Sequence, residues 1–210
     1  MVKMKLYNSF NISKKHKNSI ILIGNFDGLH LGHQKLFKLA KKYKKKYSSK
    51  IGVLTFEPMP KMFFNPQLKN FRLSNLNQKI ENLSKLNVDF VIIKKFNHKF
   101  SKTKSISFIK ETLGKRINPK FIFVSNNFKF GNKREGDVKQ LIKYEKLYKY
   151  KIIKPQPLIV KKKIISSSLI RKYLQNGKLK NANKLLKRNW SIDGKVQKGK
   201  QLGKKIGFPT

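Results

Sequence analysis

Two of the chain's four histidines lie three residues apart in the segment Gly24-Asn25-Phe26-Asp27-Gly28-Leu29-His30-Leu31-Gly32-His33. The segment follows a short apolar run and precedes a helical pattern, which predicts a strand-to-helix turn. Free N–H groups at the start of such a helix, with Gly28 and Gly32 permitting close approach, form a phosphate site. Imidazole N–H groups can stabilise charge that builds on a phosphate during displacement. The segment therefore predicts phosphate chemistry that requires no covalent enzyme intermediate.

A metal site is the alternative interpretation of the histidine pair. Zinc bound by two histidines needs further protein ligands, and Asp27 is the only obvious candidate nearby. We favour phosphate over metal for this turn and expect no metal held by the protein alone.

Apolar runs that alternate with helical patterns must position this turn. Strands are predicted over residues 20–24, 51–56, 90–93 and 121–124, with further apolar runs at 151–153 and 158–160. Helices are predicted around 36–47, 76–86, 105–113 (closed by Gly114) and 138–145, and a helix pair separated by Asn176-Gly177 follows residue 165. Strands that are nearly all apolar and separated by helices indicate a parallel sheet covered on both faces. Ligands of such sheets bind at the carboxyl ends of the strands.

The composition removes several function classes. The 51 Lys and Arg residues against nine Asp and Glu give a net charge of +42, but only five of the basic residues are Arg. Phosphate and base readers favour Arg, so the Lys excess fits a coding bias and nucleic acid is not expected as a main partner. Nine carboxylates leave few candidates for paired-carboxylate hydrolysis or a carboxylate metal cage. The chain has no Cys, no apolar leader and no apolar stretch long enough to span a membrane, so we expect a soluble cytoplasmic protein.

Five blocks in order carry a resemblance to a known family. They are NFDGLHLGH (25–33), TFEPMP (55–60), VSNNFKFGNKREGD (124–137), ISSSLIRKYL (165–174) and the glycine-spaced segment 194–210 that ends in GFPT. In this combination the chain resembles the bacterial FAD synthetases, which are bifunctional riboflavin kinase and FMN adenylyltransferase enzymes. The resemblance covers essentially the whole chain. It implies a Rossmann-like nucleotidyltransferase domain that joins the phosphate of FMN to the adenylyl group of ATP, releasing pyrophosphate, with Mg²⁺ on the triphosphate.

The resemblance also implies the site residues. His30, His33 and Arg171 are expected to be catalytic. The ATP contacts are expected to be Gly24, Phe26, Gly28, His30, Gly32, His33, Ser166, Ser167, Ser168 and Arg171. The FMN contacts are expected to be Asp27, Phe56, Pro58, Pro60, Asn127, Phe128, Phe130 and Arg134. The serines and Arg171 begin a helix and can converge on the β- and γ-phosphates, although a Ser before a helix is also an ordinary N-cap.

The segment after Leu186 is expected to differ from the rest. Residues 1–186 are predicted to form the FMN adenylyltransferase domain, and residues 187–210 an incomplete N-terminal segment of a riboflavin kinase β-barrel. Because about 20 residues cannot bury a core, we expect riboflavin kinase activity to be absent from this chain.

Two other functions stay open from the sequence. One is adenylyl or cytidylyl transfer to another small phosphorylated substrate, since the ATP half of the site is shared within the superfamily. The other is a basic RNA-binding protein on an inactive nucleotidyltransferase scaffold, which the net charge of +42 suggests.

Overall fold

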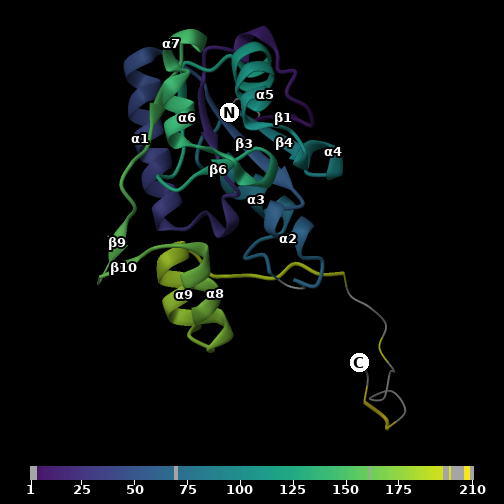
Figure 1. Ribbon diagram of the computed structural model, residues 1–210. Helices are drawn as coiled ribbons and strands as arrows, with labels where there is room; N and C mark the ends of the chain where they lie inside the picture. The colour runs from purple at the N-terminus through teal and green to yellow at the C-terminus, as the bar shows by residue number, and fades with distance from the viewer. Residues whose placement is uncertain (1–3, 69–70, 161, 196–198, 200–205, 209–210) are drawn as a thin grey trace.

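A computed structural model describes residues 4–68, 71–160, 162–195, 199 and 206–208. Its centre is a six-stranded parallel sheet with the order β1-β4-β3-β2-β5-β8 (Figure 1). The strands are β1 (Lys5–Tyr7), β2 (Ile20–Ile23), β3 (Ile51–Glu57), β4 (Phe90–Lys95), β5 (Phe121–Phe123) and β8 (Lys151–Ile153). This is the parallel sheet that the apolar runs predict, in the Rossmann-like arrangement that the family resemblance implies.

Helices cover both faces of the sheet. The helices are α1 (Leu31–Tyr47), α2 (Pro60–Phe64), α3 (Leu76–Ser84), α4 (His98–Ser101), α5 (Ser105–Ser107), α6 (Val138–Lys143), α7 (Glu145–Tyr148), α8 (Ser167–Gln175) and α9 (Leu179–Leu186), with a π-helical segment η3 (Phe108–Ile117) continuing α5. Short 3-10 turns are η1 (Lys14–His16), η2 (Asp27–Leu29) and η4 (Asn132–Arg134). Two small antiparallel pairs, β6 (Lys129–Phe130) with β7 (Gly136–Asp137) and β9 (Ile159–Val160) with β10 (Lys163–Ile164), lie outside the main sheet.

Alternation along each strand divides the core into two layers. Ile20 and Leu22 of β2 pack with Phe37 of α1 on one face of the sheet. Ile21 and Ile23 lie in the opposite layer, with residues of η3 and α6. Because both faces are covered, every residue of β2 is buried. The sheet is therefore a rigid support for loops at its ends.

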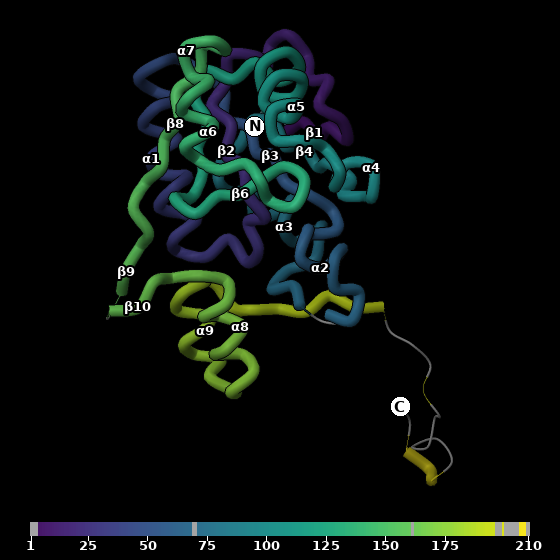
Figure 2. The backbone as a smooth tube through the Cα atoms, in the orientation of Figure 1, coloured from purple at the N-terminus to yellow at the C-terminus, as the bar shows by residue number. Residues whose placement is uncertain are grey.

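The helix pair α8–α9 forms a third, smaller cluster. Ile170, Ala182 and Leu186 are buried there against Leu73, with Trp190 packed on the edge. The pair lies at the end of the sheet where α2 follows β3, and the chain after α9 runs along that end (Figures 1 and 2). This packing brings the last helices to the carboxyl ends of the strands.

The structure differs from several of the elements expected from the sequence. The helix predicted over 105–113 passes through Gly114 and ends at Asn118, whose φ is 47°. The ring of Tyr148 packs against Gly114, where a Cβ would lie 2.5 Å from Tyr148 Cδ1. The apolar run 158–160 forms the β9–β10 hairpin instead of a sheet strand. Strand β1 was not expected, because Lys5-Leu6-Tyr7 is short and partly polar; it pairs with β4 at the sheet edge.

The β-barrel segment expected over residues 187–210 is described only in part. Residues 190–195 are described and contain no strand. Residues 196–198, 200–205 and 209–210 lie outside the described residues, so the expected opening of a barrel stays a prediction there.

Candidate active site

The turn between β2 and α1 has an unusual backbone. Phe26 (φ 48°), Gly28 (φ 77°) and Leu29 (φ 44°) all adopt left-handed conformations. Such conformations cost roughly 1–2 kcal/mol for each residue other than glycine and persist only when surrounding contacts hold them. A side chain at Gly28 would also meet Leu73, because a Cβ there would lie 2.8 Å from Leu73 Cδ1. The shape of this turn therefore depends on the segments packed around it.

His30 and His33 are brought together as a stacked pair. Their ring centroids lie 3.7 Å apart with an interplanar angle of 18°. His30 is the N-cap of α1, and its Nδ1 accepts from the backbone N–H of His33 at 3.4 Å. That bond leaves the proton of neutral His30 on Nε2. Gly32 makes the packing possible, since a Cβ there would lie 3.1 Å from His30 Cε1.

Both imidazoles are neutral at pH 7. Burial lowers the pKa of His30 to about 4, and the positive charge of Arg171 acts in the same direction. Burial lowers the pKa of His33 well below its ordinary value, helped by His30 and Lys79. The His33 side chain is only half-buried as a whole, but its Nδ1 is buried and has no hydrogen-bond partner among the described residues. The pair can therefore donate N–H groups to a phosphate but does not supply a positive charge.

Asp27 is a structural centre of the site. It is 3 % exposed, and its Oδ2 binds Nη2 of Arg171 at 2.6 Å. Its Oδ1 accepts from the backbone N–H groups of Leu73 (3.0 Å) and Ser74 (3.4 Å). Asp27 was expected to contact FMN, but in this structure both carboxylate oxygens already have protein partners.

Arg171 has a large part of its guanidinium committed to the protein. Besides its ion pair with Asp27, Nε donates to the carbonyl of Phe71 at 2.7 Å, and the guanidinium lies 3.7 Å from the centroid of the Phe71 ring. Nη1 has no partner among the described residues and is the group left for a phosphate. Arg171 thus links α8 to the turn at Asp27, a role additional to the expected one.

The three serines at the N-terminus of α8 have different positions. Ser166 is the N-cap of α8, with its Oγ accepting from Leu169 N at 3.2 Å. Ser167 Oγ donates to the carbonyl of Asp27 at 2.9 Å, and Ser168 is exposed. The ordinary N-cap interpretation thus holds for Ser166. Ser167 adds a contact to the turn that sequence reasoning did not foresee.

Two further charged side chains belong to this region: Glu57, at the end of β3, and Lys79 of α3, whose charge acts on His33. Glu57 forms an ion pair with Arg72 through Oε1, while its buried Oε2 has no partner in the described part of the chain. Lys79 of α3 is 3 % exposed, and its Nζ has no ion pair there either. Burial lowers the pKa of Lys79, against the opposing effects of Glu57 and Asp27.

The expected flavin contacts are aromatic rings, two prolines and two exposed polar residues. Phe56 and Phe128 belong to one aromatic series, in which rings pack in the order Phe56, Phe100, Phe108, Phe130, Phe128 at centroid distances of 5.7, 6.3, 5.5 and 5.5 Å. Phe130 is 9 % exposed, which favours a core role. Pro58 and Pro60 flank Met59, which is buried. Asn127 and Arg134 are exposed on the loop after β5.

Three residues that the sequence reasoning missed stand out at this end of the sheet. Arg72 binds Glu57, Lys79 lies buried between the loops, and Arg188 donates from Nη1 to the carbonyl of Gly28 at 2.8 Å. A signal was available, because Arg72, Arg171 and Arg188 are three of only five arginines in a chain saturated with Lys. At these positions a planar guanidinium donates to a carboxylate or a backbone carbonyl, a geometry that suits Arg.

No three His, Asp or Glu side chains gather to hold a metal within the described ranges. None of the helices in the part of the chain that the structure describes is long and apolar enough to cross a membrane.

A parallel sheet with a histidine pair at the first strand-to-helix turn defines a nucleotidyltransferase-like α/β protein. The FAD synthetase family model matches residues 12–169, and the riboflavin kinase model matches residues 186–210. The chain belongs to the FAD synthetase family.

Curated relatives agree with this assignment. The chain is 40 % identical over 201 residues to the bifunctional riboflavin kinase/FMN adenylyltransferase of Buchnera aphidicola subsp. Schizaphis graminum, covering 95 % of this chain and 64 % of the relative. It is 34 % identical over 201 residues to the protein of the same name from Escherichia coli K12, with the same coverages. The chain thus spans less than two thirds of the length of these relatives.

Solved structures share the fold. A protein described as a macrolide-efflux protein from Streptococcus pneumoniae aligns with a TM-score of 0.77 at 27 % identity, over 90 % of this chain and 72 % of that one. Pantoate-beta-alanine ligase from Francisella tularensis aligns with a TM-score of 0.54 at 18 % identity, over 97 % of this chain and 85 % of that one. The second likeness concerns the fold alone.

Proposed function

We propose that this chain transfers the adenylyl group of ATP to the phosphate of FMN, forming FAD and pyrophosphate. The observation that carries the proposal is the neutral, stacked His30–His33 pair at the N-terminus of α1, in a chain of the FAD synthetase family. Neutral imidazoles at a helix N-terminus suit a group that donates hydrogen bonds to a phosphate.

The proposed reaction is an in-line displacement. An oxygen of the FMN phosphate attacks the α-phosphorus of ATP, a P–O bond forms, and the bond to the bridging oxygen of the β-phosphate breaks as pyrophosphate leaves. The attacking phosphate is already ionised near pH 7, so no general base is needed. His30 donates from Nε2 to the charge that builds on the α-phosphate, while positioning and charge neutralisation supply most of the rate.

The nine carboxylates fit a mechanism without a general base. Seven of them form ion pairs (Asp27, Glu57, Glu81, Asp89, Glu111, Asp137 and Glu145). The other two accept hydrogen bonds, Glu135 from Ser105 N and Asp193 from Asn75 Nδ2. All nine thus have structural partners. We propose that Mg²⁺ accompanies the triphosphate of ATP and is not held by a carboxylate cage.

We assign the remaining contacts as expected from the sequence, except that Asp27 and the buried Phe130 are not placed against FMN. ATP is proposed to lie against the turn 24–33, the N-terminus of α8 and the free Nη1 of Arg171. The flavin is proposed to lie toward Phe56 and Phe128, with Pro58, Pro60, Asn127 and Arg134 at the rim. Asp27 acts by holding Arg171 and the loop at Leu73 rather than by contacting FMN. We propose residues 1–186 as the adenylyltransferase domain.

The direct test is incubation of the purified chain with ATP, Mg²⁺ and FMN, followed by chromatographic separation of the flavins. FAD formation with stoichiometric pyrophosphate is the expected result. Parallel reactions with nicotinamide mononucleotide, phosphopantetheine, or CTP in place of ATP test the alternative transfer reactions. Salt-sensitive RNA binding without any turnover of ATP would contradict the proposal and favour the RNA-binding alternative.

A further inference from the structure

The chain after α9 returns to the turn that carries the histidines. We propose that Arg188 is a positioning residue for adenylyl transfer, and that residues 186–193, here called the strap, hold the β2–α1 turn in its functional shape. This inference rests on the proposed function for its kinetic consequence. The contacts of this segment connect parts of the chain that are between 113 and 160 residues apart in the sequence.

Two carbonyl groups of the turn accept side-chain hydrogen bonds, one from the strap and one from α1. Arg188 Nη1 donates to the carbonyl of Gly28 at 2.8 Å. Gln34 Nε2 donates both to the carbonyl of Leu29 (3.0 Å) and to that of Leu186 (3.1 Å), so one amide group joins the turn to the start of the strap. Gly28 and Leu29 are two of the three left-handed residues of the turn. The Gly28 carbonyl belongs to the peptide unit that leads into Leu29, a left-handed residue other than glycine, so Arg188 supports the backbone next to a costly conformation.

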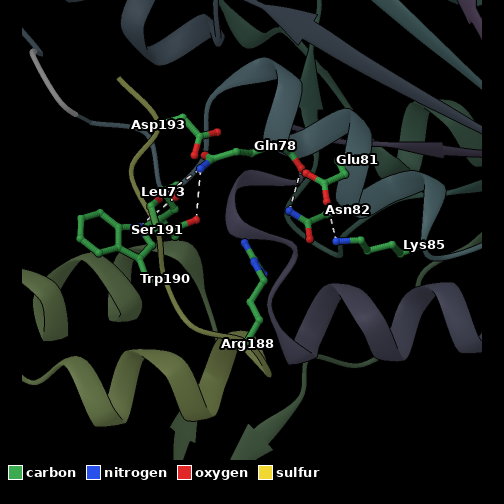
Figure 3. Close-up of a pocket in the computed structure, with 9 residues that line it drawn as sticks. All are labelled: Leu73, Gln78, Glu81, Asn82, Lys85, Arg188, Trp190, Ser191 and Asp193. Atoms are coloured by element: carbon green, nitrogen blue, oxygen red, sulfur yellow. Dashed lines mark hydrogen bonds and ion pairs between the residues drawn. The ribbon is translucent and has the colours of Figure 1, made fainter. Parts of the chain in front are cut away.

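The other end of the strap is anchored on the loop before α3 and on α3 itself. Trp190 Nε1 donates to the carbonyl of Leu73 at 2.9 Å, and Gln78 Nε2 donates to the carbonyl of Ser191 at 3.2 Å. Asn75 Nδ2 donates to Asp193 Oδ2 at 3.3 Å. Figure 3 shows Trp190, Ser191 and Asp193 alongside α3, with Arg188 extending toward the turn. Because both ends are anchored, Arg188 is held in place from two sides.

Arg188 lines a polar pocket of about 130 Å³ between α3 and the strap (Figure 3). Its guanidinium is partly buried, which lowers the pKa of Arg188, while the negative charge of Asp27 opposes that effect. Arg171 is paired with Asp27 from α8. Asp27 is therefore ion-paired with the guanidinium of Arg171, and its charge also acts on Arg188, which holds the adjacent Gly28 carbonyl. Arg188 therefore affects both the charge around Asp27 and the position of the Gly28 carbonyl.

His30 is the group that the strap positions for chemistry. It follows Leu29 directly, and its Nδ1 is fixed by the first turn of α1. If the Gly28 carbonyl is released, the direction of the backbone into His30 is no longer fixed from this side. Small misplacements of a catalytic donor reduce the rate of the chemical step more than they reduce binding of a distant substrate group. Loss of Arg188 should therefore lower kcat rather than raise the KM for FMN.

The kinetic test compares Arg188→Ala, Arg188→Lys and the neighbouring control Lys187→Gln, an exposed residue. Arg188→Ala is expected to lower kcat about tenfold or more, with the KM for FMN changing by less than about twofold. Arg188→Lys should recover part of the loss, because a Lys can still donate one hydrogen bond to the Gly28 carbonyl. Lys187→Gln should match the unaltered chain. A full kcat in Arg188→Ala would overturn the inference.

A second measurement separates this inference from the proposed function. Hydrogen exchange of a peptide covering residues 24–33 is expected to be faster in Arg188→Ala, while a peptide covering β5 is unchanged. If the unaltered chain forms no FAD but this exchange still responds, the proposed function fails and the positioning role stands. Unchanged exchange at 24–33 would overturn the positioning role whatever the activity. If Arg188→Ala does not fold, Arg188→Lys and Trp190→Phe, which frees the Leu73 carbonyl, carry the same two readouts.

Discussion

The two histidines of the turn are neutral donors held in a fixed geometry. Their rings stack at 3.7 Å, a separation at which two imidazolium charges would repel strongly. Positive charge near the site instead comes from Arg171, Arg188, Arg72 and Lys79, which surround Asp27 and Glu57. The chemistry is thus divided between imidazole donors and guanidinium or ammonium charges.

His30→Ala and His33→Ala should each slow adenylyl transfer by roughly a hundredfold or more, as expected for loss of one donor to transition-state charge. FMN binding should change little. His30→Asn is the matched variant, because Asn is a good N-cap and preserves the start of α1. Initial rates of FAD formation and FMN titrations give the measurement. Near-normal turnover in both Ala variants would remove these residues from the mechanism.

The burial of His30 makes the free energy of unfolding depend on pH. His30 has a pKa of about 4 in the folded chain and about 6.5 when unfolded. Between these values the unfolded state binds more protons, so stability falls as pH falls from about 6.5 to about 4, by on the order of 3 kcal/mol in total. Urea unfolding at pH 7 and pH 4.5 should show a smaller loss in His30→Asn than in the unaltered chain. Identical losses would show that His30 does not contribute.

Arg171→Lys should weaken both the fold and the use of ATP. A Lys keeps the charge but cannot donate to Asp27 and the Phe71 carbonyl while stacking on the Phe71 ring. Losing one hydrogen bond to a charged group costs about 1.5–3 kcal/mol. Denaturant unfolding and the KM for ATP are the measurements, and Arg116→Lys, an exposed site, is the control. Unaltered stability together with unaltered kinetics at limiting ATP would contradict this role.

At the scale of elements, the sheet keeps the site in place because its strands pack without gaps. β3 lies at the centre of the pairing between β2 and β4. Gly52 of β3 lies directly against the ring of Phe90 in β4, where a Cβ would overlap that ring. The carboxyl end of the same strand carries Phe56 and Glu57 to the candidate site. Packing inside the sheet thus determines where those side chains emerge.

Gly52→Ala should destabilise the chain by about 1–3 kcal/mol, as overpacking does in a filled core. Gly194→Ala is the matched control, since no atom lies within 4 Å of a Cβ at that position. Denaturant unfolding of both variants gives the comparison. Equal stability of Gly52→Ala and Gly194→Ala would show that Phe90 moves aside without cost.

At the scale of the whole molecule, the charge is highly unbalanced. The nine carboxylates all have structural partners, whereas the chain carries 51 Lys and Arg residues and a net charge of +42. Most of the ammonium groups therefore have no carboxylate to pair with, and they repel one another. Their mutual repulsion opposes the compact state and is screened by salt within about 10 Å at 0.1 M.

Added NaCl should consequently raise the melting temperature. Each 1 kcal/mol of repulsion relieved corresponds to about 2–4 °C for a chain of this size. Melting in 20 mM and 300 mM NaCl measures the effect, and an uncharged osmolyte at matched osmolality is the control. A melting temperature that falls with salt would show that the ion pairs outweigh the repulsion.

The sequence by itself determined the sheet strands of high apolar content and the location of the histidine turn. Both are local signals. Ile20–Ile23 is apolar throughout because both faces of β2 are covered, and the glycines and histidines of the turn can be read directly from the sequence. It did not reveal β1, whose three residues are held by pairing with β4 rather than by their own pattern. Nor did it show that the helix continues through Gly114, or that the ring of Tyr148, distant in the sequence, packs against that glycine.

Only the tertiary structure decided which side chains bind the β2–α1 turn. The partners of Asp27 and Gly28 include Ser167, Arg171 and Arg188, which lie 140, 144 and 160 residues further along the chain. Periodicity and propensity describe neighbours within a few residues, and they carry no information on which side chains meet when α8 and α9 pack at the end of the sheet. The rarity of Arg in the sequence hinted at these positions. The packing of the last helices against the first turn is what gave the arginines their partners.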